Sequence, residues 1–232
     1  MLKVEVYKVS HSPNYLFLTL VIVIVAMFLG VSTTQMNIAE SDELVSIAFV
    51  SSSAVIMLYI SILACIYINR DYASNNYRLL VGTGIGRMKV LLSKYVIFLF
   101  LGILIIVLHT ISAFTIPYFM RGFSIGIHQI AKMLLYILVY LSIISTMFLL
   151  SILGRTVLKS ILFNIAYLII SSIVVILLSH FPKLSIFLPV NSLQLIAGNI
   201  TQNQCISISM VSLLYIIITL ILAQFVFSKQ EL

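Results

Sequence analysis

The chain alternates long apolar runs with short polar connections. Runs of mainly apolar residues extend over Tyr15–Ser32, Leu44–Ile68, Tyr95–Pro117, Met133–Leu153, Ile161–Ser179 and Cys205–Phe227. A helix rises about 1.5 Å per residue, so about 20 apolar residues cross the roughly 30 Å hydrocarbon core of a bilayer. Helices are expected because the backbone finds no water to bond within that core. The pattern predicts an all-α polytopic membrane protein with six transmembrane helices.

Three segments fit neither a membrane span nor a plain loop. Residues 1–13 place apolar residues near one helical face and Lys3 and Lys8 toward the other, which predicts a helix lying in the inner membrane interface. Residues 180–204 are too interrupted to span but too apolar for a solvated loop. We expect them to form an extracellular or re-entrant segment with short helices at the outer leaflet. Residues 69–94 are polar and predict a cytoplasmic loop that contains a short helix.

The composition indicates one domain, solvated by lipid. Of the 232 residues, 62% are hydrophobic and 8% charged, against about 25% charged in soluble globular domains. Removing the six runs leaves no stretch long enough for a separate soluble domain, so we predict a single transmembrane domain over residues 1–232. Cys65 and Cys205 lie in apolar runs without metal-ligand spacing and are interpreted as small buried hydrophobes.

The basic residues are unevenly divided between the two sets of connections. Ten of the 13 Lys and Arg residues lie in the N-terminal segment, the 69–94 loop, the turn at 154–159 and the C-terminal segment. The other connections hold Arg121, Lys132 and Lys183, together with the acidic Glu40, Asp42 and Glu43. Positively charged connections favour the cytoplasmic side, so both ends and the 69–94 loop are predicted to be cytoplasmic. This topology also accounts for the net charge of +7.

The sequence lacks the motifs of the common enzyme classes. There is no H-E-x-x-H or G-x-S-x-G motif, and Asp71 and Glu231 lie outside the predicted spans. The GTGIGR stretch has neither the spacing nor the preceding strand of a phosphate-binding loop. With no carboxylate inside a span, proton- or sodium-coupled transport lacks its usual groups. The chain is therefore predicted not to be an enzyme and to bind no metal, and energy must come from a partner if it is used at all.

A few polar side chains fall within or at the ends of the spans. His109 and Asn164 are candidates for a transport path, although snorkelling of His109 to the outer interface and helix-to-helix bonding by Asn164 are the simpler interpretations. Lys94, Arg155 and Lys159 are predicted to anchor span ends at the inner interface. Arg155 and Lys159 leave open a second, smaller contact with a partner protein.

The 69–94 loop has the most distinctive pattern in the chain. It contains Asp71, then the run from Asn75 to Leu80, then Gly84 within a glycine cluster, and finally Arg87 and Lys94. The last two residues are seven positions apart, which is about two helical turns, so they share one face of a helix. A short helix across the base of the membrane domain is expected, placed to pack into a groove on a partner and to pass its movement to the neighbouring spans.

These loop residues resemble the ABC-2 family of ABC-transporter permeases. In that family the loop between the second and third spans forms a coupling helix that docks on the nucleotide-binding subunit. The residues that the resemblance assigns to this contact are Asp71, Tyr77, Arg78, Leu79, Leu80, Gly84 and Arg87. The layout is also similar, with an amphipathic N-terminal helix, six spans and a proline-bearing outer segment before the last span. Asp71 stands where many relatives have Glu.

The resemblance implies a function as the permease subunit of an ATP-driven exporter. The expected partners are two ATPase subunits, a second permease, the lipid bilayer and a substrate, but no nucleic acid. ATP and magnesium would bind the partner ATPase, and this chain itself would hold no cofactor. Its small size and composition look like the short permeases of Gram-positive bacteria that export, or give immunity to, amphipathic peptides, including lantibiotic-immunity, bacitracin-type and phenol-soluble modulin permeases. The expected location is the bacterial plasma membrane.

Two other classes of function remain open from the sequence. One is an ATP-independent small channel or secondary carrier. The other is an accessory membrane protein that scaffolds a larger complex without forming a path. Substitution of Asp71 or Arg87 distinguishes a scaffold from the exporter, because only in the exporter should these changes uncouple ATP hydrolysis from transport.

Overall fold

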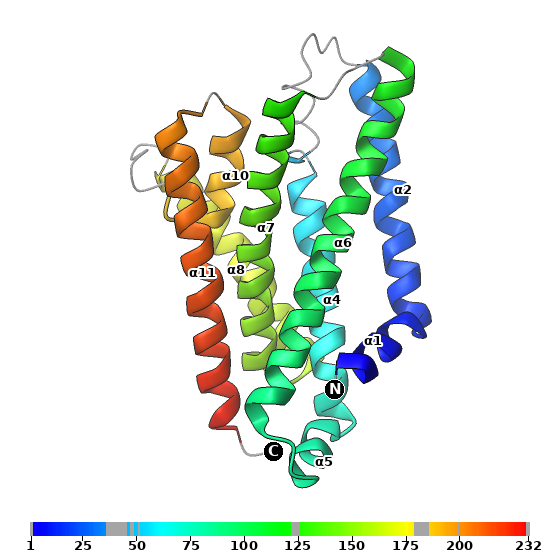
Figure 1. Ribbon diagram of the computed structural model, residues 1–232, viewed down its shortest axis with the longest axis vertical. Helices are drawn as coiled ribbons and strands as arrows, with labels where there is room; N and C mark the ends of the chain where they lie inside the picture. Colours follow the sequence, from blue (N-terminus) through cyan, green and yellow to red (C-terminus); the bar gives the residue numbers. More distant parts are fainter. Residues whose placement is uncertain are drawn as a thin grey trace.

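The computed structural model describes residues 2–35, 46, 49–50, 52–121, 126–178, 186–198 and 200–230. Throughout these residues the regular structure is helical, which confirms the all-α prediction. The helices, in chain order, are α1 (Leu2–Ser10), α2 (Pro13–Gln35), α4 (Ser53–Ala73), α5 (Asn76–Gly82), α6 (Arg87–Arg121), α7 (Ile127–Gly154), α8 (Val157–Leu178), α10 (Pro189–Ala197) and α11 (Gln202–Ser228) (Figure 1).

Five helices are long and apolar enough to cross a membrane. They are α4, α6, α7, α8 and α11, with the spanning parts at Ser53–Ala73, Arg87–Ser112, Gln129–Gly154, Val157–Leu177 and Gln202–Ser228. The predicted sixth span, Tyr15–Ser32, falls within the 23-residue helix α2, in which only the shorter apolar stretch Thr19–Phe28 was found. The prediction of six spans is therefore supported for five helices and not confirmed for α2.

The helix ends differ from the predicted ends on both sides of the 69–94 segment. Helix α4 continues to Ala73, and α6 already begins at Arg87, so only residues 74–86 connect the two and α5 lies within that connection. The prediction of a loop over 69–94 was too long, because polar side chains end an apolar run without ending the helix. Helix α4 begins at Ser53, whereas the predicted span began at Leu44, and part of 44–52 lies outside the described residues.

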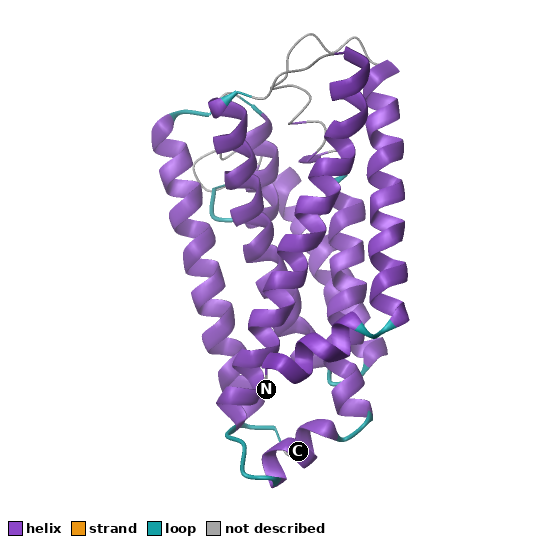
Figure 2. Ribbon diagram, turned by 45° about the vertical axis from the view of Figure 1, so that its right-hand side comes forward, coloured by secondary structure: helices purple, strands orange, loops and turns teal. Residues whose placement is uncertain are grey.

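The helices form an elongated bundle around α7. Helix α7 packs against α11, α8, α4, α10 and α6, and α2 packs along α6 (Figures 1 and 2). Small residues permit these close approaches: a Cβ atom added to Gly102 in α6 would lie 2.5 Å from Cδ1 of Ile144 in α7. Hydroxyl groups add bonds between helices, since the Tyr95 hydroxyl lies 2.6 Å from Oγ of Ser145, which also bonds Thr219 of α11.

A short helix precedes the last span, within the predicted 180–204 segment. Helix α10 begins with Pro189, whose fixed φ suits the first helical position, and packs on α7, α8 and α11. Helix α11 then begins with a capping box, in which the Thr201 side chain accepts from the Gln204 backbone amide and the Gln204 side chain accepts from that of Thr201. Residues 179–185 and 199 lie outside the described part of the chain.

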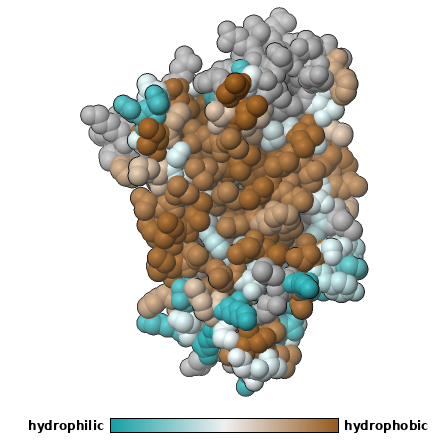
Figure 3. Space-filling model, viewed as in Figure 1, coloured by the Kyte–Doolittle hydropathy of each residue, from teal (hydrophilic) through white to brown (hydrophobic). Residues whose placement is uncertain are grey.

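One end of the bundle carries α1, α5 and both ends of the described chain, and we call this end the base (Figure 1). A broad apolar belt covers the middle of the molecule, and hydrophilic residues gather at the base below it (Figure 3). Helix α1 lies across the bundle at this level and packs on α6 and α2. The base is therefore where the polar loop residues of the sequence come together.

Candidate functional site

Helix α5 is a two-turn helix bounded by residues that can adopt a left-handed backbone. Asn75, immediately before it, has φ 54°, a conformation that asparagine tolerates better than most residues. At its other end Gly84 has φ 86°. The Gly84 amide bonds the Val81 carbonyl at 3.0 Å and the Ile85 amide bonds the Leu80 carbonyl at 3.3 Å, which together form a Schellman motif. Gly84, predicted as a partner-coupling residue, thus has a local role in ending the helix.

The two faces of α5 have opposite characters. Tyr77 points into the bundle and is 3% exposed, and Leu80 is half-buried. Arg78 and Leu79 lie on the outer face, and the Leu79 side chain is 64% exposed. The helix therefore presents a cation and a large apolar side chain to its surroundings while Tyr77 fixes it from within.

Tyr77 is packed among rings from two other helices. Its ring centroid lies 4.5 Å from that of Tyr72 in α4 and 5.2 Å from that of Phe227 in α11. Burial raises the pKa of the Tyr77 phenol well above its ordinary value, so the group stays neutral. Its hydroxyl donates to the Ile68 carbonyl at 3.4 Å.

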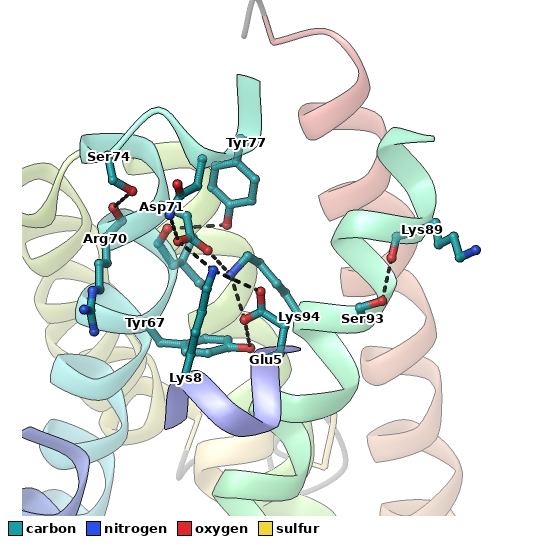
Figure 4. A network of polar contacts seen from close by, with 12 residues as sticks. Glu5, Lys8, Tyr67, Arg70, Asp71, Ser74, Tyr77, Lys89, Ser93 and Lys94 are labelled. Atoms are coloured by element: carbon teal, nitrogen blue, oxygen red, sulfur yellow. Dashed lines mark hydrogen bonds and ion pairs between the residues drawn. The ribbon is translucent and has the colours of Figure 1, made fainter. Parts of the chain in front are cut away.

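A buried ion network lies directly beside α5 (Figure 4). The Lys94 ammonium of α6 contacts two carboxylates, that of Asp71 in α4 and that of Glu5 in α1, the latter at 3.1 Å. Lys8 of α1 also reaches both carboxylates, at 3.4 Å from Asp71 and 3.5 Å from Glu5. Lys94 and Glu5 are each 1% exposed, so the network is closed to solvent on that side. Two cations balance two anions, as burial of charge requires.

Neutral side chains complete the bonding of these ions. The Tyr67 hydroxyl donates to Oε2 of Glu5 at 3.1 Å, and the Asn76 amide of α5 donates to Oδ1 of Asp71 at 2.9 Å. The Lys94 Nζ atom lies 4.8 Å from the centroid of the Tyr67 ring and 5.4 Å from that of Tyr77. Through these contacts α5 is joined to α1, α4 and α6 in one polar cluster.

Two members of this network were missed by the sequence analysis. Glu5 received no role there, and Lys8 was assigned to a solvated face of the amphipathic helix. A signal for Glu5 was present: it is four residues before the apolar Val9, so the two lie on one side of a helix, and Val9 packs against the core. Lys94 was predicted as an interface anchor, whereas the structure places it inside the base.

Arg87 also makes its contacts within the chain. Its guanidinium donates from Nη1 to the carbonyl of Ser228 at 2.7 Å and to that of Gln230 at 3.0 Å. Ser228 is the last residue of α11 and Gln230 lies just beyond it, so both carbonyls are at the helix end where the dipole favours a cation. Of the residues assigned to the partner contact, Arg78 and Leu79 are at the surface, whereas Asp71, Tyr77 and Arg87 bind the surrounding helices.

The remaining predicted site residues lie apart from this cluster. Asn164 is fully buried and donates to the Ser151 hydroxyl at 3.1 Å, a bond between α8 and α7, while Arg155 and Lys159 are exposed at the base. His109, in α6, lies 2.9 Å from Oγ of Ser52. A role of His109 or Asn164 in a transport path stays a prediction. Within the described residues, no group of three or more His, Cys, Asp or Glu side chains is placed to hold a metal ion.

Most of the chain matches a known protein family. Residues 1–171 match the family described as ABC-2 family transporter protein, which covers α1, α5 and the whole ion network. The chain belongs to the ABC-2 transporter family. A comparison with curated proteins found no match. ABC-2 family proteins are membrane components of transporters that generally work with ATPase partners, and they are generally not catalytic themselves.

In this ABC-2 protein the contacts at the base decide how α5 is held and which of its faces is exposed. The four ions of the network bond one another and the side chains of Tyr67 and Asn76. The arrangement is suited to holding α5 rigidly against three other helices. The outer face of α5, which carries Arg78 and Leu79, remains exposed to a second protein.

Proposed function

We propose that this chain is the permease subunit of an ATP-driven exporter and that α5 is its coupling helix. The observation that carries the proposal is the exposed pair Arg78 and Leu79 on a helix whose opposite face is fixed in the bundle. A partner that binds the outer face of α5 and displaces this helix would also move α1, α4 and α6, because the buried ions join these helices to α5.

The charges of the base suggest the chemistry of the partner surface. At the base, the exposed side chains that carry a full charge at neutral pH, among the described residues, are all basic: Lys3, Arg70, Arg78, Lys89, Arg155, Lys159 and Lys229. The two carboxylates described there, Glu5 and Asp71, are buried and neutralised. A groove on the ATPase that receives α5 should therefore combine an apolar contact for Leu79 with an acidic rim.

The finer features of the proposal follow the family resemblance and the distribution of charge. Two ATPase subunits and a second permease would complete the transporter, with ATP and magnesium on the ATPases. The basic residues favour a cytoplasmic base, hence cytoplasmic ends, in a bacterial plasma membrane. The substrate would be a hydrophobic or amphipathic peptide, handled for toxin export or for immunity to antimicrobial peptides.

Co-purification tests this proposal. The tagged chain, extracted from its native membrane, should bring down an ATP-hydrolysing subunit. Replacing Arg78 and Leu79 together with alanine should weaken this association by at least about tenfold, because burial of one leucine side chain alone is worth about 1.5–3 kcal/mol. The affinity is measured by titrating the solubilised ATPase onto the immobilised chain.

The matched control is a second exposed pair outside the base. Leu213 and Leu214 of α11 are 50% and 56% exposed, and their replacement with alanine should leave the affinity unchanged. If no ATPase accompanies the unaltered chain, the proposal is contradicted and the interpretation as an ATP-independent channel or carrier is favoured. If an ATPase accompanies it but the Arg78 and Leu79 change has no effect, α5 is not the docking element.

A further inference from the structure

A second cluster at the base surrounds the segment that follows α11. Gln230 is only 2% exposed although its side chain is a polar amide. Such a side chain is buried at a cost unless its donor and acceptor both find partners. Here both do, and each partner belongs to a different helix.

The bonds of Gln230 reach three helices. The Tyr72 hydroxyl of α4 donates to its Oε1 atom, and its own Nε2 atom donates to the Ile152 carbonyl of α7 at 3.1 Å. Arg87 at the start of α6 donates to its backbone carbonyl at 3.0 Å. Ile152 lies in the last turn of α7, and its carbonyl would otherwise be left without a partner in the helix ladder.

The Gln230 cluster also contacts α5, through the buried side chain of Tyr77. The Tyr77 ring lies between Tyr72, which bonds Gln230, and Phe227 in the last turn of α11. The ion network connects α5 to α1, α4 and α6, whereas this second cluster connects it to α7 and α11. Among the described residues none of the four ions contacts α11, so the Gln230 cluster adds a link to α7 and α11 that the ions themselves do not make.

We propose that Gln230 is a positioning residue that transmits movement of α5 to α7 and α11. The inference rests on the proposed function, because it assumes that an ATPase moves α5. A displacement of Tyr77 would press on Tyr72 and Phe227, and the amide of Gln230 would carry it to the end of α7. Without the amide, α5 could still dock and Tyr77 would still contact Phe227, but the end of α11 would lose its bonds to α4 and α7 and would follow α5 less closely.

Amide hydrogen exchange, measured in the complex with the ATPase, distinguishes the docking of α5 from the movement of α11 that follows it. In the unaltered complex, ATP should change amide exchange both in α5 and in the second half of α11. Gln230→Met keeps the size of the side chain but removes both polar groups, so the ATP response of α11 should fall clearly below that of the unaltered complex while that of α5 remains. Tyr72→Phe, which removes one hydroxyl and keeps the ring, should reduce the α11 response and is the milder variant should Gln230→Met fold poorly.

Gln202→Met is the matched control, because Gln202 is an exposed glutamine at the other end of α11. It should leave both responses unchanged. An α11 response as large in Gln230→Met and in Tyr72→Phe as in the unaltered complex would overturn the inference and leave the docking of α5 intact. An unaltered complex in which ATP changes nothing in α5 would instead overturn the proposed function, and the inference with it.

Discussion

Replacing Lys94 with methionine should lower the free energy of unfolding by about 3–5 kcal/mol, the usual cost of removing one partner from a buried ion pair. The side chain would fit, but Glu5 and Asp71 would be left in the bundle with only Lys8 to balance them. Thermal or denaturant unfolding of the purified chain in detergent, followed by circular dichroism, measures the change.

The control for this prediction lies on the same helix. Lys89 is exposed and points away from the network (Figure 4), so Lys89→Met should change stability by less than about 0.5 kcal/mol. Adding Asp71→Asn to Lys94→Met should recover part of the loss, because one charge of each sign is then removed. Equal stability of Lys94→Met and Lys89→Met would mean that the ions are not paired as described.

Replacing Gly154 with alanine should also destabilise the protein strongly, by about 1–3 kcal/mol or more. Gly154 ends α7, and an added Cβ atom would lie 2.2 Å from Oγ, 2.6 Å from N and 2.7 Å from Cα of Ser160 in α8. Backbone atoms cannot turn aside as a flexible side chain can, so the two helix ends would have to separate. The same unfolding measurement reports this effect.

Separation of these helix ends would also disturb bonds that join α8 to α4 and to α7. The Asn69 amide donates to the Ser160 hydroxyl at 2.8 Å, and that hydroxyl donates to the Ser151 carbonyl at 3.0 Å. The control is Gly82→Ala, because nothing lies within 4 Å of an added Cβ there and alanine is the better helix former. An unchanged stability in Gly154→Ala would show that α7 and α8 do not meet this closely.

The spans were predictable because lipid imposes a simple rule on the sequence. A segment that crosses a bilayer must be apolar over a fixed length and must satisfy its own backbone, and both demands are visible without a structure. The boundaries were less predictable. Asp71 was placed in a loop because it is charged, yet it lies in α4, where Lys94 and Asn76 bond it from outside the helix.

The partners of the charged residues could not be read from the sequence. Residues Glu5 and Lys94 are 89 positions apart, and their contact depends on how α1 crosses α6. The same limit applied to Arg87, which was expected to meet a second protein and instead binds the last residue of α11 and the segment after it. Spacing tells which residues share a face of a helix, but not what that face meets.

A short helix between α4 and α6 was expected from the loop residues, but the sequence did not separate its two faces. The buried Tyr77 was assigned to the partner contact together with Arg78 and Leu79. Arg78 and Leu79 are exposed on the outer face of α5, as a docking surface requires. Whether a second protein occupies this face is the central question for the function.

A photo-crosslinking amino acid at position 79 gives the most direct test of that question. In native membranes it should form an adduct with an ATP-hydrolysing subunit, and the yield should change when ATP is added, because the ATPase would then press on α5. The same probe at position 214 of α11, 56% exposed in the native residue, should give no such adduct. Adducts at position 79 with lipid alone, or with the same ATPase yield as position 214, would contradict the account.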